Sequence, residues 1–274
     1  MKTNIVIFYI FFALVVSLNA QISIYPPSLF IDNRTRSGEL TIKNTSNELR
    51  EIAMEAIFGY IGYDSLGNRM DIYNDTTNLI NYSLARFLKI FPPKLIVPPN
   101  ELQTVRVFLL NLPDLPDGTY ITRFSAISNP LSKQIDTTNQ GQVSASISLR
   151  TKMISAIFYQ KGNLTTDISF ELEKIISDSN NYSLLFNVSK FGNSPFWGKL
   201  KYQIFDEKGK EVVGADELIS YYIQSKKRIT IDRNLIKSGR YKIELFYSTD
   251  RSDIPEERRI PFKDKKQEIY FNID

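Results

Sequence analysis

The longest uninterrupted pattern in the chain runs from Val143 to Tyr159, without a Gly, Pro, Asn or Asp that would turn it. In its first half, apolar residues alternate with polar ones and share one face: Val143, Ala145, Ile147 and Leu149. The other face carries serines and two basic residues, Arg150 and Lys152, as in a half-buried β-strand. From Met153 onward both faces are apolar, which predicts a strand buried inside a sandwich. We therefore expect one long strand whose alternating half is an exposed edge offered to a partner.

Short apolar runs separated by turn residues fill the rest of the first half, which predicts an all-β fold. The runs are 22–25, 29–31, 40–44, 51–63, 84–91, 95–97, 103–109 and 117–124. Pro26-Pro27 interrupts the first of them, which is typical of an edge strand that changes sheets. Residues 64–68 have the composition of a hairpin turn. Together with 143–159, the set predicts a seven-stranded immunoglobulin-like sandwich.

A polar segment at 160–163 predicts a short linker, and a second all-β unit follows it. Its predicted strands are 168–176, 182–190, 199–205, 228–231, 240–247 and 268–273, with a clear hairpin turn at 206–210. Gly118-Thr119-Tyr120 and Gly239-Arg240-Tyr241 resemble each other and predict a tyrosine at a strand corner in each half. The predicted fold class is therefore all-β, with two immunoglobulin-like β-sandwich domains in tandem at 21–159 and 160–274.

The first twenty residues have the pattern of a secretory signal peptide. Lys2 precedes an apolar run, Ile5 to Val16, and the segment ends in Ser17-Leu18-Asn19-Ala20, which predicts cleavage after Ala20. A transmembrane anchor is the alternative, but the run is short and no basic cluster follows it. We expect export without stable membrane insertion after cleavage. Removing Lys2 from the 34 Lys and Arg leaves 33 against 30 Asp and Glu, a balance that predicts no nucleic-acid partner.

The composition excludes several kinds of chemistry, because the chain has neither Cys nor His. Catalysis by Ser-His-Asp or Cys-His groups and zinc sites of thiolate or imidazole are ruled out. The acidic residues Asp64, Asp71 and Asp75 lie near one another in sequence but lack the spacing of a calcium loop. We interpret them as solvated turn residues. We expect no catalytic residue, no metal and no cofactor, and therefore no enzyme.

An ordered set of motifs spans residues 22–159. These are Leu40-Thr41-Ile42-Lys43-Asn44, Pro92-Pro93, Leu95-Ile96-Val97-Pro98-Pro99, Gln103-Thr104-Val105-Arg106-Val107, Leu112-Pro113, Tyr120 with Arg123-Phe124, and Ile147-Ser148-Leu149-Arg150-Thr151-Lys152. The set resembles the N-terminal domain of the PapD-like family, the periplasmic chaperones of pilus assembly. That family has two immunoglobulin-like domains set in a boomerang, and its last N-domain strand lends alternate apolar side chains to an incomplete pilin.

The resemblance implies a function, partners and a location. It implies that Val143, Ala145, Ile147 and Leu149 are donor residues, which we call the donor set. The implied partners are pilin-like or other β-rich secreted subunits and an outer-membrane usher, and the implied location is the periplasm. The family holds the client's C-terminal carboxylate with an Arg and a Lys, but Ser28 and Ile154 occupy the aligned positions here. Basic residues that can replace them are Arg150, Lys152, Arg34 and Arg36.

Two other functions fit the sequence. In a tandem immunoglobulin-like adhesive or scaffold protein of the cell surface, the alternating face would be ordinary core. A glycan-binding or glycan-cleaving protein would expose aromatic residues such as Trp197, Tyr221 or Tyr222. Trp197 is more simply interpreted as a packed sandwich aromatic. The sequence favours the chaperone, because an alternating edge strand behind a polar, turn-rich segment at 132–142 suits strand donation.

Overall fold

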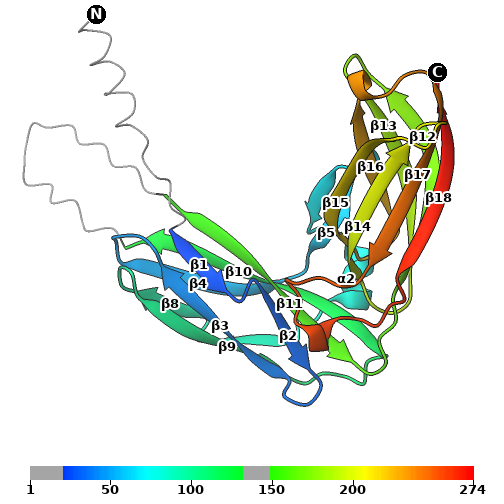
Figure 1. Ribbon diagram of the computed structural model, residues 1–274. Coiled ribbons are helices and arrows are strands. Elements are labelled where there is room, and N and C mark those ends of the chain that lie inside the picture. Colours follow the sequence, from blue (N-terminus) through cyan, green and yellow to red (C-terminus); the bar gives the residue numbers. More distant parts are fainter. Residues whose placement is uncertain (1–20, 132–148) are drawn as a thin grey trace, which may run out of the picture.

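The computed structural model describes residues 21–131 and 149–274. Within these ranges the chain forms two β-sandwiches that meet at an angle, so that the molecule has the shape of a boomerang (Figure 1). This confirms the predicted fold class. No helix in the described residues is long and apolar enough to cross a membrane. The predicted signal peptide, residues 1–20, lies outside the described residues and stays a prediction.

The first sandwich consists of two sheets. One has the order β1-β3-β9-β7 and contains Ile22–Tyr25, Ser37–Asn44, Leu102–Leu109 and Leu88–Phe91. The other has the order β2-β11-β10-β4-β8 and contains Ser28–Asp32, Thr151–Lys161, Gly118–Pro130, Arg50–Ile57 and Lys94–Val97. Alternate residues of both sheets face inward. Leu40, Val105, Phe124 and Tyr159 are among those that form the core between them.

Two strands of this sandwich change sheets at proline pairs. β1 pairs with β3, and after Pro26-Pro27 the chain continues as β2 beside β11 in the opposite sheet. In the same way β7 pairs with β9, and after Pro92-Pro93 the chain continues as β8 beside β4. Proline has no N–H to continue a ladder, which is why each strand leaves its sheet there. The predicted switch at Pro26-Pro27 is confirmed, and the second switch divides a further strand in two.

An excursion from the first sandwich was predicted only in part. The expected strand 51–63 is two strands, because β4 ends at Ile57 and β5, Tyr60–Tyr63, pairs instead with β6, Arg69–Ile72. The predicted hairpin turn at 64–68 joins β5 to β6. A helix that the sequence did not predict, α2, follows at Thr76–Tyr82. Figure 1 shows β5 and α2 beside the second sandwich, where the Tyr63 ring stacks on Tyr221 with 5.1 Å between centroids.

The second sandwich also has two sheets and its own core. One sheet has the order β12-β13-β16, with strands Asp167–Ser177, Asn181–Phe191 and Ser225–Asp232. The other has the order β15-β14-β17-β18, with strands Glu211–Tyr221, Phe196–Phe205, Gly239–Ser248 and Lys265–Ile273. All six predicted strands are present, and β15 was missed. Because β11 continues to Lys161, the division of the chain after residue 159 stays a prediction.

Each sandwich contains one of the predicted tyrosine corners. The Tyr120 hydroxyl donates to the carbonyl oxygen of Pro116 at 2.9 Å, just before β10. The Tyr241 hydroxyl donates to the carbonyl oxygen of Lys237, also at 2.9 Å, just before β17. In both cases the ring is buried while its hydroxyl bonds the backbone four residues upstream, which is the geometry of this motif in immunoglobulin-like domains. The two Gly-x-Tyr segments therefore form the same structural motif, one in each sandwich.

A third apolar cluster joins the two sandwiches, and it overturns one expectation. Trp197 does not fill the core of the second sandwich; it packs at 4.6 Å from Phe158 of β11 and at 5.8 Å from Phe30 of β2, measured between ring centroids. Tyr222 and Ile254 belong to the same cluster. The neighbouring residue Phe196 faces the core instead, because successive residues of a strand point to opposite faces.

Candidate functional site

One edge of β11 is open. β10 pairs with β11 along its whole length, from Gly118–Lys161 to Ser128–Thr151. On the other side β2 pairs only with Ala156–Gln160. In the part of the chain that the structure describes, residues 151–155 therefore have no strand partner on this side, and we call them the open segment. An unpaired strand edge presents backbone N–H and C=O groups that can accept a strand from another chain.

The two faces of β11 have different partners. Met153, Ile157 and Tyr159 face the core of the first sandwich. Ala156 and Phe158 point the other way, into the cluster between the sandwiches. The apolar residues predicted on both faces are thus present, but only one face belongs to the sandwich core. Leu149 has the same parity as Ile157, so the core-facing side and the predicted donor side are continuous along the strand.

The structure describes only the end of the donor set. The side chain of Leu149 is 54% exposed and lies just before β11, which begins at Thr151. Val143, Ala145 and Ile147 lie outside the described residues, so their role as donors stays a prediction. The strand expected from Val143 onward is observed from Thr151 only. The serine at 155, on the open segment, donates its hydroxyl hydrogen to the carbonyl oxygen of Pro27 at 2.9 Å.

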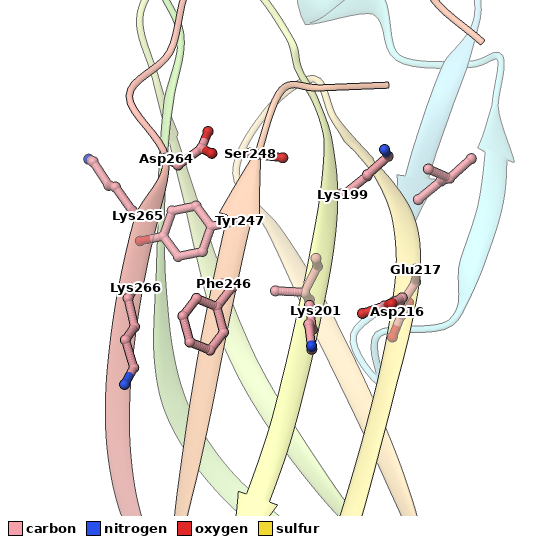
Figure 2. Close-up of a pocket in the computed structure, with 12 residues that line it drawn as sticks. Lys199, Lys201, Asp216, Glu217, Phe246, Tyr247, Ser248, Asp264, Lys265 and Lys266 are labelled. Carbon is pink, nitrogen blue, oxygen red and sulfur yellow. The ribbon is translucent and has the colours of Figure 1, made fainter. Parts of the chain in front are cut away.

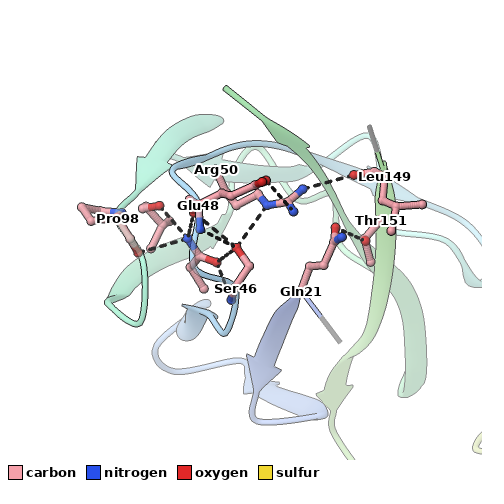
Figure 3. A network of polar contacts seen from close by, with 9 residues as sticks. Gln21, Ser46, Glu48, Arg50, Pro98, Leu149 and Thr151 are labelled. Carbon is pink, nitrogen blue, oxygen red and sulfur yellow. Dashed lines mark hydrogen bonds and ion pairs between the residues drawn. The ribbon is translucent and has the colours of Figure 1, made fainter. Parts of the chain in front are cut away.

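A network of polar groups holds the chain where β11 begins (Figure 3). The guanidinium of Arg50 donates to the carbonyl oxygen of Leu149 at 3.1 Å and to the Ser46 hydroxyl at 3.2 Å. The Thr151 hydroxyl donates to the side-chain oxygen of Gln21 at 2.8 Å. Sequence reasoning missed Arg50 and Gln21. Arg50 immediately precedes the predicted apolar run 51–63, and nothing in a single sequence says that a charged residue there is buried.

The predicted basic residues are divided between the two ends of β11. Arg150 is exposed and precedes the strand. Lys152 lies on the outward face, where its ammonium is 3.8 Å from the Glu55 carboxylate. Arg34 and Arg36 follow β2, which runs parallel to β11 and ends opposite Gln160, so they lie at the far end of the strand from Arg150. The structure therefore does not bring the four residues together.

The outward face of this sheet holds a further basic residue. Ser28 and Ile154, where the resemblance implied basic residues, lie on that face on neighbouring strands, and Ser28 pairs with Ala156. Arg123 of β10 is opposite Ala156 on its other side. Its Nε donates to the carbonyl oxygen of Gly59 at 3.1 Å, and no carboxylate within the described ranges forms an ion pair with it. In the sequence Arg123 stands out only as part of the motif with Tyr120 and Phe124, and no local pattern marks it as a binding residue.

The aromatic residues that a glycan site would expose are buried. Tyr221 is 1% exposed, and Trp197 and Tyr222 are also buried. Burial raises the pKa of Tyr221 and of Tyr222. Without exposed rings these residues cannot stack on a sugar, and the expectation attached to the glycan-binding function is wrong.

The acidic residues considered for calcium have structural partners. A carboxylate oxygen of Asp64 accepts hydrogen bonds from the backbone N–H groups of Leu66 and Asn68, both at 2.8 Å. Asp75 caps α2 by accepting from the Asn78 N–H at 2.9 Å. The side-chain amide of Asn68, which also donates to Asp64, and these backbone N–H groups lower the pKa of Asp64. The Asn78 N–H lowers the pKa of Asp75. Among the described residues no group of three acidic side chains is arranged to hold a metal ion.

A broad hollow lies on the outer face of the second sandwich (Figure 2). It has a volume of about 610 Å³ and is lined by residues of β14, β15, β17 and β18. Most of its lysines are paired with acids: Lys199 with Asp250 at 3.8 Å, Lys265 with Asp167 at 2.5 Å and Lys266 with Glu244 at 3.0 Å. This charge is locally compensated, so the hollow has the character of an ordinary solvated sheet face.

Comparisons with known proteins agree with the fold. The chain matches no family model, and no curated protein matches it in sequence. Its structure is similar to that of the YadV chaperone, with a TM-score of 0.50 and 12% identity over 91% of this chain and 100% of YadV. A chain of the CsuC–CsuE chaperone–tip subunit complex from Acinetobacter baumannii matches with a TM-score of 0.47 and 12% identity, over 91% of this chain and 98% of that one.

A third similar structure is the Salmonella enterica SafA pilin in complex with the SafB chaperone. It matches with a TM-score of 0.41 and 10% identity, over 93% of this chain and 97% of that one. At 12% identity the likeness to YadV shows a common two-domain fold and nothing finer. What the chain does must therefore be argued from its own open edge.

Proposed function

We propose that this protein is a periplasmic chaperone that caps β-rich pilus or surface-fibre subunits by donating an edge strand. The observation that carries the proposal is the open segment of β11. The open segment belongs to the same strand as the well-packed residues 156–160, but the pairing with β2 begins only at Ala156. A client that lacks a strand can add its own edge there, and the donor set, Val143, Ala145, Ile147 and Leu149, supplies the alternate apolar side chains.

The export of the chain and its partners belong to the same proposal. A cleaved signal peptide at residues 1–20 would deliver the chain to the periplasm, where the clients are secreted subunits and the outer-membrane usher is the second partner. No catalytic group is required, because strand addition uses backbone hydrogen bonds and side-chain burial. The competing function is a tandem immunoglobulin-like adhesive or scaffold protein, in which the donor set would be ordinary core.

A pair of serine substitutions tests the donor set. Ile147→Ser with Leu149→Ser is expected to leave the melting temperature of the free protein nearly unchanged, because Leu149 is more than half exposed. Capture of a co-expressed pilin-like subunit is expected to fall at least a hundredfold, since each buried Leu or Ile contributes about 1.5–3 kcal/mol. Unchanged capture with a lowered melting temperature would favour the scaffold protein instead.

We further propose that a basic residue on the outward face receives the client's C-terminal carboxylate. Arg150 and Lys152 are the candidates from the sequence. Arg123 joins them because it forms no ion pair with a carboxylate in the described residues and its backbone pairs with Ala156, the residue after the open segment. A client with an amidated C-terminus is expected to bind about 1.5–3 kcal/mol more weakly, the usual contribution of a charge-assisted hydrogen bond. Glutamine substitutions of the three residues, one at a time, identify which of them is responsible. Equal binding of the amidated and free client would exclude a carboxylate anchor.

A further inference from the structure

Arg50 is a buried arginine for which the proposed function so far gives no reason. It is the first residue of β4 and pairs with Pro130 of β10 and Val97 of β8, so it lies at one end of the five-stranded sheet. Its side chain is only 4% exposed and has the inward parity of Ile52 and Met54. A guanidinium buried to this extent is costly unless its N–H groups are hydrogen-bonded.

The acceptors around the guanidinium are mostly neutral. Its Nε donates to the Ser46 hydroxyl, and its Nη1 donates to the carbonyl oxygen of Leu149. The one carboxylate in contact is that of Glu48, at 3.4 Å, and this side chain is 66% exposed. An exposed carboxylate at that distance contributes little. The two neutral oxygens are therefore the contacts that keep Arg50 in place.

A second residue makes this arrangement rigid. The side-chain oxygen of Asn44, which is fully buried, accepts from the Ser46 hydroxyl at 2.7 Å. Its amide nitrogen donates to the carbonyl oxygens of Val97 and Glu48, at 2.9 and 2.7 Å. The resulting series of hydrogen bonds runs from the end of β8 through Asn44, Ser46 and Arg50 to Leu149, and Figure 3 shows its part from Ser46 to Leu149. The guanidinium is thus held on one side by the body of the sandwich.

The hydrogen bond from Arg50 to the Leu149 carbonyl is the unusual one in this series. Its carbonyl precedes the last pair of the β10–β11 ladder, Ser128 with Thr151, so within the described residues no strand pairs with it there. A side chain from 99 positions away takes the place of the missing backbone partner. Gln21 accepts a further hydrogen bond from the Thr151 hydroxyl. The chain that leads into the open segment is therefore held at Leu149 by a side chain, and the β10–β11 pairing begins only at Thr151.

We propose that Arg50 is a positioning residue, which holds the carbonyl of Leu149 and so fixes the direction in which the Leu149 side chain and the open segment face a client. This inference rests on the proposed function. A segment fixed in advance has less conformational freedom to lose when a client strand is added. Register also matters, because a slip by one residue would turn the side chains of the open segment to the opposite face.

The first test follows backbone hydrogen exchange in the free protein. Arg50→Lys keeps the charge but loses the forked donors that reach Ser46 and Leu149 together. We expect exchange at residues 151–155 to become about tenfold faster, with exchange at Ile157–Tyr159 unchanged. The control, Arg106→Lys, removes an exposed guanidinium paired with Glu39 and should change neither. Equal acceleration throughout the first sandwich, or none at 151–155, would overturn the proposal.

The second test asks whether Arg50 acts through Leu149. With a co-expressed pilin-like subunit as the probe, Arg50→Lys is expected to weaken capture about tenfold in the otherwise unaltered protein. In a Leu149→Ala background the additional loss should be threefold or less, because the positioned side chain is already gone. Equal losses in both backgrounds would overturn the positioning role.

The two tests separate this inference from the proposed function. If the unaltered protein captures no subunit, the proposed strand donation is wrong, and so is a role of Arg50 in client capture. The exchange measurement still decides whether Arg50 holds Leu149. If Arg50→Lys does not fold, Ser46→Ala replaces it, since this change removes one acceptor of the guanidinium and keeps the charge. The same pattern of exchange, at smaller amplitude, is then expected.

Discussion

The two halves of β11 differ in what covers them. Ala156–Gln160 pairs with β2 on one side and β10 on the other, while its two faces pack in the sandwich core and against the second sandwich. The open segment, residues 151–155, pairs with β10 alone, and Ile154 on its outward face is 39% exposed. One continuous strand is therefore structural in one half and available in the other.

This difference shows how an open edge can persist in a β-sandwich. Exposed edges invite aggregation unless charged or polar groups interrupt them. In the open segment, Thr151, Lys152 and Ser155 flank Met153 and Ile154, and the Ser155 hydroxyl is already bonded to the β1–β2 connection. These polar and charged groups limit nonspecific pairing along the open segment.

The largest effect is expected where β11 is covered on all sides. Ile157 is 2% exposed in the core of the first sandwich, and Ile157→Ser removes that burial and leaves a hydroxyl without a partner. We expect a loss of about 4–6 kcal/mol in the free energy of unfolding. Denaturant unfolding followed by circular dichroism measures it.

Ile154→Ser is the matched control in the open half. It removes the same side chain three residues earlier, where it is partly solvated, and should lower stability by less than about 1 kcal/mol. Similar losses for the two variants would mean that the halves of the strand do not differ as described.

A second prediction separates the two faces of the covered half. Phe158→Ala removes a ring from the cluster between the sandwiches, next to Trp197 and Phe30, at a cost of about 3 kcal/mol. Because this contact joins two domains that each have a core, we expect calorimetry to show one transition for the unaltered protein and two for the variant. A single transition at a lower temperature would instead mean that Phe158 belongs to the folding unit of one sandwich.

The third prediction concerns Lys190, beside the same interface. Burial lowers the pKa of this lysine from its usual 10.5 to about 8, in a narrow gap that Tyr60 and Tyr82 also line. Between pH 8 and 10.5 the folded protein binds fewer protons at this site than the unfolded chain, so stability should rise with pH in that window. Below pH 8 Lys190 is protonated in both the folded and the unfolded protein, so its contribution to stability no longer changes with pH.

The size of that rise is limited by solvent. The Lys190 ammonium donates to the carbonyl oxygen of Gly192 at 2.7 Å at the surface, where water screens part of its burial. We therefore expect the free energy of unfolding to rise by about 1 kcal/mol between pH 8 and 9.5, less than the full pKa shift would give. Urea unfolding across this range measures it. Lys190→Met should remove the slope, and a slope that persists in the variant would assign it to other groups.

The sequence predicted the elements well where periodicity and turn chemistry agree. Two sandwiches, the switch at Pro26-Pro27 and the tyrosine corners at Tyr120 and Tyr241 all follow from patterns local to the chain. β15 was missed because its burial is interrupted and it carries Gly214 and three acidic residues. α2 was missed because it is short and none of its residues is buried, so it has no apolar stripe to detect.

The candidate site was less predictable for a physical reason. An alternating strand shows which residues share a face, but not whether that face is covered by the same chain. Trp197 illustrates the limit, since its burial was predicted but its partners, Phe30 and Phe158, belong to the other sandwich. Arg50 illustrates it again, because its main acceptor, the carbonyl oxygen of Leu149, is 99 residues away. Contacts between distant segments carry no local signal.

The smallest effect is expected at Lys152, in the open half. Its ammonium is 3.8 Å from the Glu55 carboxylate, and both side chains are about half exposed, so the ion pair should contribute less than about 0.5 kcal/mol. Lys152→Gln is therefore expected to leave the melting temperature within about 2 °C of the original, since 1 kcal/mol shifts it by about 2–4 °C in a chain of this size. If Lys152 receives a client carboxylate, the same variant should lose about 1.5–3 kcal/mol of client binding, and Glu55→Gln should not, because it frees the ammonium. Weaker binding in both variants would show that the pair itself shapes the edge, and unchanged binding in Lys152→Gln would leave Arg150 and Arg123 as the residues to test.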